Sequence, residues 1–200
     1  MYRPRAFRVD DRDRLEAVID AHPFALLVGP GLRATALPLL RDGPDHLCGH
    51  LAAANPHARA LEEGTEVLAV FQGPHAYVSP RWYASPRAVP TWNYVSVQVR
   101  GRIEPLDAPA PRGAMRAMVD RFEGAERSRA VVADDVVEGM IGGIRAFRVR
   151  IDALEGVFKL SQNRSAEDRA GVASALREAD DEASRAIAAL MDAAPAAEAP

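Results

Sequence analysis

An alternation of aliphatic and polar residues over positions 95–103 constrains the fold more than any other feature of this chain. Aliphatic side chains fall at every second position except one, with polar residues between them, at Val95, Val97, Val99 and Ile103. Gly101 interrupts the aliphatic series. A two-residue period is typical of a strand that has one face in the core and the other in water. We therefore expect a half-buried antiparallel strand here, with Gly101 as a candidate β-bulge.

Shorter strand signals recur along the chain and are separated by turn residues. They cover residues 24–29, 33–40, 46–52, 67–71, 75–79, 147–151 and 157–160. Gly29-Pro-Gly31 predicts a hairpin turn between the first two strands. Gln72-Gly73-Pro74 and Gly156 predict turns that separate the later strands.

Helical periodicity is expected over residues 10–22, 111–127 and 134–142. A further helix should open at Ser165, which forms a capping-box pattern with Asp168, and should continue to about Leu190. Short strands joined by turns and flanked by helices indicate an α+β architecture, namely an antiparallel β-barrel with peripheral helices.

The length of 200 residues suits one domain with a proper core. No apolar run approaches the length of a membrane span, and the first residues lack the apolar stretch of a secretory signal. A single cysteine, Cys48, excludes an internal disulfide and suits a reducing compartment. We therefore expect a cytoplasmic protein without a membrane partner.

The charge distribution argues against a broad DNA-binding face. Residues 165–200 hold eight of the 28 acidic and three of the 25 basic residues, which leaves 22 basic against 20 acidic residues in the rest. Such a near-neutral body is not the electrostatic footprint of a DNA-binding domain. Local arginine clusters at residues 3–8 and 145–150 are more readily interpreted as solvated surface than as phosphate contacts.

The rarest residue types concentrate in four short blocks, residues 49–56, 71–83, 89–94 and 158–164. Lys159 is the only lysine among 25 basic residues, and both tryptophans and all six side-chain amides lie in or beside these blocks. A bias that stops at particular positions indicates that those positions need their specific side chains.

A mononucleotide site would explain these residue types. Such a ligand needs a cation and hydroxyl groups for its phosphate, amides for the ring edge and aromatic walls for the ring faces. Lys159 and Ser161, two apart on a strand, should present an ammonium and a hydroxyl on one face. Trp92 beside Asn93 offers a ring next to an amide. The segment after Ser161 continues with Gln162, Asn163 and Arg164. The alternative is that the tryptophans are partly buried core residues and that the Gly, Pro and Asn residues build turns.

Other chemistries fit less well. His46 and His50 are four apart, which on a strand separates them by roughly 13 Å, too far to chelate one metal ion. No Gly-x-Ser-x-Gly elbow of a serine hydrolase is present. Haem ligation by His50 or His75 is a further, less favoured alternative.

Read in order, the blocks resemble the PaiB-type proteins, which are usually described as FMN-binding negative transcriptional regulators. The resemblance runs from residue 1 to about residue 172, and its longest segments are Phe71-Gln-Gly-Pro-His-Ala-Tyr-Val-Ser-Pro-Arg-Trp-Tyr83 and Lys159-Leu-Ser-Gln-Asn-Arg164. It implies an FMN-binding split barrel, similar to pyridoxamine phosphate oxidases and flavin reductases, in which a homodimer holds FMN at the subunit interface. The expected organisation is an FMN-binding split-barrel domain over residues 1–172, a C-terminal helix over 173–192 packing on it, and a disordered tail over 193–200.

Matches to the family blocks and chemical suitability together predict the cofactor-binding residues. They are Lys159, Ser161, Gln162, Asn163, Trp92, Asn93, Thr35, His50 and Asn55. Three departures from the family pattern remove polar or cationic side chains. Ala36 stands where the family has histidine, Ala53 where it has arginine, and Val157 where it has lysine. If any of these side chains contacts FMN in the family, the affinity of this chain for FMN is reduced.

Two functions follow from the resemblance and from flavin chemistry. The first is an FMN-binding transcriptional regulator, a repressor that could contact DNA directly. The alternative is a flavin-dependent oxidoreductase of the NAD(P)H:flavin reductase or oxidase type, in which the cofactor supplies the redox chemistry and no catalytic side chain is required.

Overall fold

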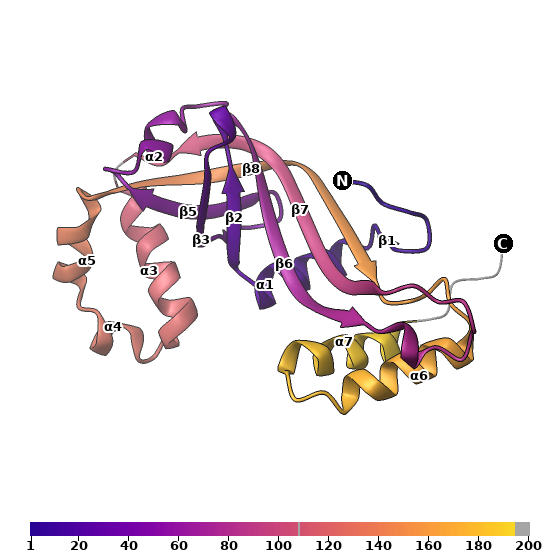
Figure 1. Ribbon diagram of the computed structural model, residues 1–200. Helices are drawn as coiled ribbons and strands as arrows, with labels where there is room; N and C mark the ends of the chain where they lie inside the picture. Colours follow the sequence, from indigo (N-terminus) through magenta and orange to yellow (C-terminus); the bar gives the residue numbers. More distant parts are fainter. Residues whose placement is uncertain (108, 195–200) are drawn as a thin grey trace. The chain divides into compact units, whose positions relative to one another are not determined.

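The computed structural model describes residues 1–107 and 109–194, and the expected tail falls almost entirely outside this range. The chain contains both helices and strands (Figure 1). In chain order they are β1 (Arg8–Val9), α1 (Arg12–Ala21), β2 (Phe24–Val28), η1 (Pro30–Leu32), β3 (Ala34–Pro38), β4 (Leu40–Arg41), β5 (His46–Ala52), α2 (Pro56–Ala60), β6 (Glu66–Val78), η2 (Pro80–Trp82), β7 (Thr91–Pro105), α3 (Ala110–Glu123), α4 (Ser128–Val131), α5 (Asp134–Ile141), β8 (Ile144–Lys159), α6 (Ala166–Arg177) and α7 (Glu182–Ala193).

The strands form one sheet in the order β3-β2-β6-β7-β8-β5-β4, and β1 pairs with β8. The predicted hairpin of β2 and β3 is confirmed, with Leu26 opposite Ala36 in an antiparallel register. The chain clusters into two compact units, each assembled from separate stretches of sequence. The first comprises residues 1–18, 72–97 and 155–194, and the second residues 19–71 and 98–154. The two units are described separately.

The predicted turn at Gly73-Pro74 is wrong, because β6 continues through it. Buried positions fall at Val67, Ala69, Phe71 and Gly73, and then at Ala76 and Val78. The alternation therefore shifts by one residue at Pro74, as it does at a β-bulge. A Cβ at Gly73 would lie 3.1 Å from the Val95 Cβ on β7, so the glycine permits close packing of neighbouring strands.

The predicted turn at Gly156 is also wrong, because β8 runs unbroken to Lys159. Gly156 pairs with Val9 of β1 in the first unit. A Cβ at Gly156 would overlap the Cδ2 atom of Leu15, which is buried on α1. Glycine is therefore needed here so that α1 can pack on the strand.

The first unit contains two C-terminal helices where the sequence pattern predicted one. Ser165 caps α6 as expected, accepting a hydrogen bond from the backbone N–H of Asp168 at 3.1 Å. The helix stops at Arg177, and Asp181 caps α7 by accepting a hydrogen bond from the backbone N–H of Ser184. This second cap starts a new helix, and α6 and α7 pack side by side (Figure 1).

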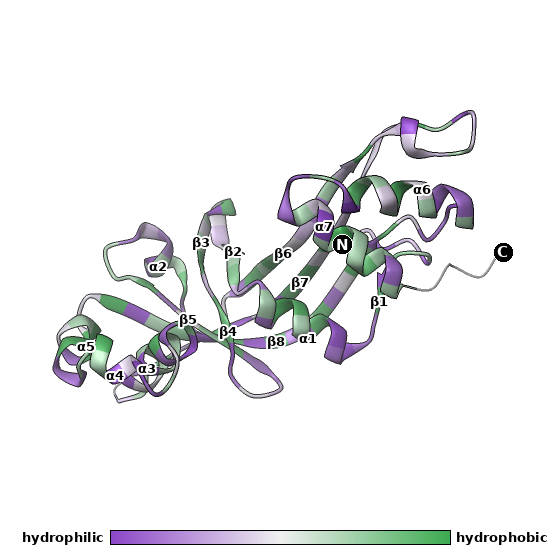
Figure 2. Cartoon of the chain, turned by 90° about the horizontal axis from the view of Figure 1, so that it is seen from below, coloured by the Kyte–Doolittle hydropathy of each residue, from purple (hydrophilic) through white to green (hydrophobic). Residues whose placement is uncertain are grey.

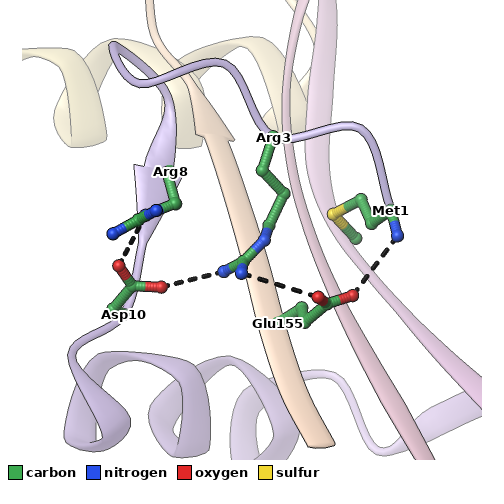
Figure 3. Close-up of polar contacts among 5 residues, drawn as sticks. All are labelled: Met1, Arg3, Arg8, Asp10 and Glu155. Atoms are coloured by element: carbon green, nitrogen blue, oxygen red, sulfur yellow. Dashed lines mark hydrogen bonds and ion pairs between the residues drawn. The ribbon is translucent and has the colours of Figure 1, made fainter.

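The N-terminal segment of the first unit is held by ion pairs (Figure 3). Arg3 bridges Asp10, at 2.9 Å, and Glu155, at 3.5 Å. Arg8 also pairs with Asp10, and the amino group of Met1 lies 3.3 Å from a Glu155 carboxylate oxygen. Two of the three arginines in the cluster at residues 3–8, Arg3 and Arg8, are therefore paired with carboxylates.

In the second unit the strands supply much of the core, and the largest fully buried side chains include Leu27, Leu47, Ile103 and Phe147. The predicted helix over 111–127 ends at Glu123, because Gly124 adopts a φ of 83° and breaks the helix. Its neighbour α5 is amphipathic and carries both hydrophobic and hydrophilic residues (Figure 2).

The predicted strand over 95–103 is confirmed and extends over the whole of β7. The two-residue alternation of buried and less buried positions continues through Gly101 without a shift. In the second unit a Cβ at this position would overlap the backbone carbonyl oxygen of Arg150. The glycine thus marks a close approach between two strand backbones.

Candidate functional site

The predicted cofactor residues of the first unit lie at the start of β7 and the end of β8. The ammonium of Lys159, which is half-buried, donates a hydrogen bond to the hydroxyl oxygen of Thr91. Burial lowers the pKa of Lys159, and the nearby positive charge of Arg164 lowers it further.

Arg164 stacks on an aromatic ring. Its guanidinium carbon lies 4.8 Å from the centroid of the Tyr83 ring. Among the residues that the structure describes, neither Lys159 nor Arg164 forms an ion pair with a carboxylate. Two neighbouring cations without a direct acidic partner are chemically suited to an anion such as phosphate.

Asn93 and Ser161 meet in the interior. Asn93 is fully buried, and its amide nitrogen lies 3.0 Å from the Ser161 hydroxyl and 3.4 Å from the sulfur of Met191. Ser161 lies just beyond the end of β8 and adopts a φ of 59°. Lys159 thus contacts Thr91 on β7, and Ser161 contacts Asn93 two residues further along the same strand.

The side-chain amide of Gln162 forms two hydrogen bonds with the backbone. Its carbonyl oxygen accepts a hydrogen bond from the N–H of Leu160 at 2.7 Å, and its amide nitrogen donates to the carbonyl of Phe158 at 2.6 Å. Gln162 therefore builds the turn that follows Lys159. Asn163 is exposed beside it.

Trp92 points away from Asn93, because adjacent residues on a strand face opposite sides. The indole is 52% exposed, whereas Asn93 is buried. The rings of His75 and Tyr77 on β6 lie 6.1 and 6.0 Å from the Trp92 ring. The structure therefore forms an exposed aromatic cluster, and it does not bring the Trp92 ring and the Asn93 amide together.

The remaining predicted residues lie in the second unit, where two of them contact a histidine that sequence reasoning missed. The Oγ1 of Thr35 lies 2.9 Å from Nδ1 of His57. The side chain of Asn55 accepts a hydrogen bond from the backbone N–H of His57 at 2.9 Å and caps α2. His57 is only 2% exposed.

His50 lies on β5, opposite Ala146 of β8. Burial lowers the pKa of this imidazole, so it is neutral near pH 7. In the described part of the chain, no hydrogen bond joins His50 to Thr35 or Asn55. The same part contains no cluster of His, Cys, Asp or Glu with the geometry of a metal site.

The three departures from the family pattern fall in different environments. Ala36 is exposed, on the opposite face of β3 from Thr35, and Ala53 is exposed after β5. Val157 is 1% exposed and contributes to the core of the first unit. The missing histidine therefore belongs to the outer face of the hairpin, and the missing lysine is replaced by core packing.

Comparisons with known proteins agree with the resemblance noted from the sequence. The family model described as "Putative FMN-binding domain" matches residues 1–153. Protease synthase and sporulation protein PAI 2 of Bacillus subtilis is 32% identical over 203 residues, covering 96% of this chain and 97% of that protein. An uncharacterised protein of Aspergillus fumigatus is 32% identical over 197 residues, covering 72% and 75% of the two chains.

Two solved structures share the fold at lower identity. The FAD and haem binding protein from Mycobacterium smegmatis gives a TM-score of 0.63 at 22% identity, covering 82% of this chain and 78% of that one. A flavocytochrome from Azotobacter vinelandii gives 0.62 at 22% identity, with coverage of 85% and 78%. The predicted α+β fold with an antiparallel split β-barrel is confirmed. No helix in the described ranges is long and apolar enough to cross a membrane. Because the family model matches residues 1–153 of the 200 and a relative aligns over 96% of this chain, this chain belongs to the family of FMN-binding domains.

Proposed function

We propose that this protein binds FMN and that Lys159 and Arg164 receive the phosphate group. The observation that carries the proposal is Lys159, whose ammonium lies beside the hydroxyl of Thr91 and has no ion-pair partner among the described residues. Arg164, stacked on Tyr83, follows it in the same segment. A phosphate would accept charge-assisted hydrogen bonds from both.

The donor set fits the chemistry of FMN. Lys159, Arg164 and the Thr91 hydroxyl suit the phosphate, and exposed aromatic side chains such as Trp92 suit the face of a planar ring. FMN, when bound, supplies one- and two-electron redox chemistry, and the protein supplies binding and orientation. Asn93, Ser161 and Gln162 would act by holding the ends of β7 and β8 in place. Asn163, Thr35, His50 and Asn55 remain proposed cofactor contacts.

The test is FMN binding by wild-type protein and by Lys159→Ala, followed by flavin absorbance after gel filtration and by titration. Loss of one charge-assisted contact to phosphate should weaken FMN binding by about ten- to a hundredfold. Riboflavin, which lacks the phosphate, should bind both proteins alike. Arg129→Ala removes an exposed cation from α4 and should leave both affinities unchanged. Equal FMN affinity in Lys159→Ala and wild type would overturn the phosphate assignment.

We also propose that a second copy of the chain covers the outer face of the β2–β3 hairpin. On this face Phe24 is 68% exposed and Leu26 43% exposed, and the cross-strand residues Ala34 and Ala36 are exposed beside them. An uncharged patch of this kind is self-complementary and suits a twofold contact between identical chains.

The cellular role that we favour is that of a flavin-dependent transcriptional regulator. Its support is the family resemblance and the end-to-end similarity to the protease synthase and sporulation protein PAI 2. Four of the six arginines in the two local clusters, Arg3, Arg8, Arg148 and Arg150, are each paired with a carboxylate, which argues against phosphate contacts by these four. A gel-shift assay over promoter fragments at physiological salt tests the role, and a complete absence of binding would count against direct DNA recognition.

The alternative role is a flavin-dependent oxidoreductase. It requires that NADH or NADPH reduce the bound flavin, which bleaches the visible absorption band of oxidised flavin. Flavin that stays oxidised with both nucleotides would weigh against this role without affecting FMN binding.

A further inference from the structure

His57 occupies an unusual position for a buried imidazole in the second unit. One ring nitrogen, Nδ1, lies 2.9 Å from the Thr35 hydroxyl oxygen. The other, Nε2, is buried and has no hydrogen-bond partner in the described residues. In a buried histidine both ring nitrogens normally form hydrogen bonds. Because only one does so here, the protonation state of each nitrogen has to be determined.

His57 is neutral near pH 7. Burial lowers the pKa of the imidazole, and the positive charge of Arg33 lowers it further. A neutral imidazole has one N–H donor and one acceptor nitrogen. In one tautomer Nδ1 presents an N–H to Thr35 and the buried Nε2 has a lone pair. In the other tautomer the N–H is on Nε2 and Nδ1 accepts a hydrogen bond from Thr35.

The buried Nε2 atom distinguishes the two tautomers, because it has no hydrogen-bond partner among the described residues. Gly29 lies against it, since a Cβ at Gly29 would come 2.5 Å from Nε2. A buried N–H without an acceptor is rarer and more costly than a buried lone pair without a donor, so Nε2 is the unprotonated nitrogen. The proton therefore belongs on Nδ1, which donates to Oγ1 of Thr35.

This tautomer fixes the role of the threonine. Because Oγ1 already accepts from His57, the Thr35 hydroxyl proton must point elsewhere, and the described residues give it no acceptor. We propose that His57 is a positioning residue that holds the Thr35 hydroxyl as a hydrogen-bond donor to an oxygen atom of bound FMN. The proposal rests on FMN binding, but it does not depend on the assignment of the phosphate to Lys159.

The placement of Thr35 suits this role. It lies on β3, an end strand of the sheet, opposite Leu27, and it is half-buried rather than enclosed. FMN offers oxygen acceptors on its phosphate, its ribityl chain and its ring. A donor of fixed direction selects these oxygens over groups that can only donate.

The tautomer can be measured without any ligand. Long-range ¹H–¹⁵N correlation spectra of the free protein assign the protonated ring nitrogen of His57 from its ¹⁵N shifts. We expect a protonated Nδ1 and an unprotonated Nε2. A protonated Nε2 would overturn the proposal directly, whatever the affinity for FMN.

The second test compares variants in FMN and riboflavin titrations. Thr35→Val, which loses the hydroxyl, should weaken FMN binding about tenfold, and Thr35→Ser should restore it. His57→Asn retains a donor near the position of Nδ1 and should bind more tightly than His57→Leu. Thermal unfolding of each variant establishes that it is folded under the conditions of the titration.

The outcomes separate the hypotheses. A loss confined to FMN assigns the acceptor to the phosphate, and an equal loss for riboflavin assigns it to the ribityl chain or ring. Unchanged affinity of Thr35→Val for both ligands overturns the proposal. A wild-type protein that binds neither flavin refutes the proposed function, while the NMR result still decides the tautomer.

Discussion

The carboxylate of Asp168 accepts two hydrogen bonds from Ser85, one from the backbone N–H at 3.0 Å and one from the hydroxyl at 2.8 Å. Asp168 lies in the first turn of α6, and its own backbone N–H is capped by Ser165. One buried carboxylate therefore joins the segment between η2 and β7 to the start of α6. The two hydrogen bonds from Ser85 lower the pKa of Asp168, and the Arg164 charge lowers it further.

The first prediction concerns stability against pH. Because the folded-state pKa of Asp168 lies below its ordinary value of 3.8, its stabilising contribution is present at neutral pH and is lost as the pH falls through the folded-state value. Asp168→Asn should be less stable than wild type at pH 7, and the difference should shrink below about pH 4. Urea unfolding of both proteins across this range measures it, and a difference independent of pH would contradict the prediction.

The second prediction concerns Gly101. Alanine there should destabilise the fold by roughly 1–3 kcal/mol, because its methyl group would meet the backbone of β8 at Arg150. Gly113→Ala is the matched control, since a Cβ at this exposed position in α3 meets nothing within 4 Å. It should stabilise by about 0.5–1 kcal/mol. Chemical unfolding gives both values, and equal effects would show that the strands separate easily.

The third prediction concerns the buried pair of Asn93 and Ser161. Asn93→Leu should cost about 1–3 kcal/mol, since it leaves the Ser161 hydroxyl buried without its partner. The double variant with Ser161→Ala removes both polar groups and should cost less than the sum of the single changes. Additive costs in the unfolding free energies would mean that the pair is not coupled.

The fourth prediction concerns Cys48. Burial, together with the negative charge of Asp42, raises the pKa of its thiol to about 11, although Arg148 acts in the opposite direction. At pH 8 the folded protein should therefore react with iodoacetamide about a hundredfold more slowly than the urea-unfolded chain. Mass spectrometry of timed samples gives the two rates, and similar rates would indicate an accessible thiolate.

The fifth prediction concerns the proposed self-association. Wild-type protein should sediment at twice the 21.6 kDa mass of the chain, and Phe24→Asp should shift it to the monomer mass. Tyr2→Asp is the control, because Tyr2 is 87% exposed and belongs to the other unit. A monomeric wild type, or a Phe24→Asp variant that remains dimeric, would exclude this face as the dimer contact.

Periodicity predicted most of the secondary structure, because β5, β7 and α1 each repeat their apolar residues at the spacing of their own geometry. The two turns that were wrongly predicted within strands came from glycine. Gly73 and Gly156 carry the same sequence signal as turn glycines, yet here they admit Val95 and Leu15 against a continuous strand. Only the tertiary contact distinguishes the two uses.

The residues of the candidate site also differ in whether the sequence could identify them. Lys159 was identifiable from sequence because it is the only lysine in an arginine-rich chain. His57 was not, because a histidine after Asn55-Pro56 carries no local pattern. Its significance arises from Thr35 and Gly29, which are more than 20 positions away and reach it only in the folded chain.

The interleaving of the two units sets an order for folding during synthesis. Every residue of the second unit has been translated by residue 154, whereas the first unit needs residues 155–194 to meet segments made much earlier. During synthesis, the residues that pack on α6 and α7 stay exposed until these helices have been translated. Asn93, for example, cannot contact Met191 until the end of translation. A truncation after residue 153, where the family match ends, would remove residues 155–194. The core of the first unit would then remain incomplete.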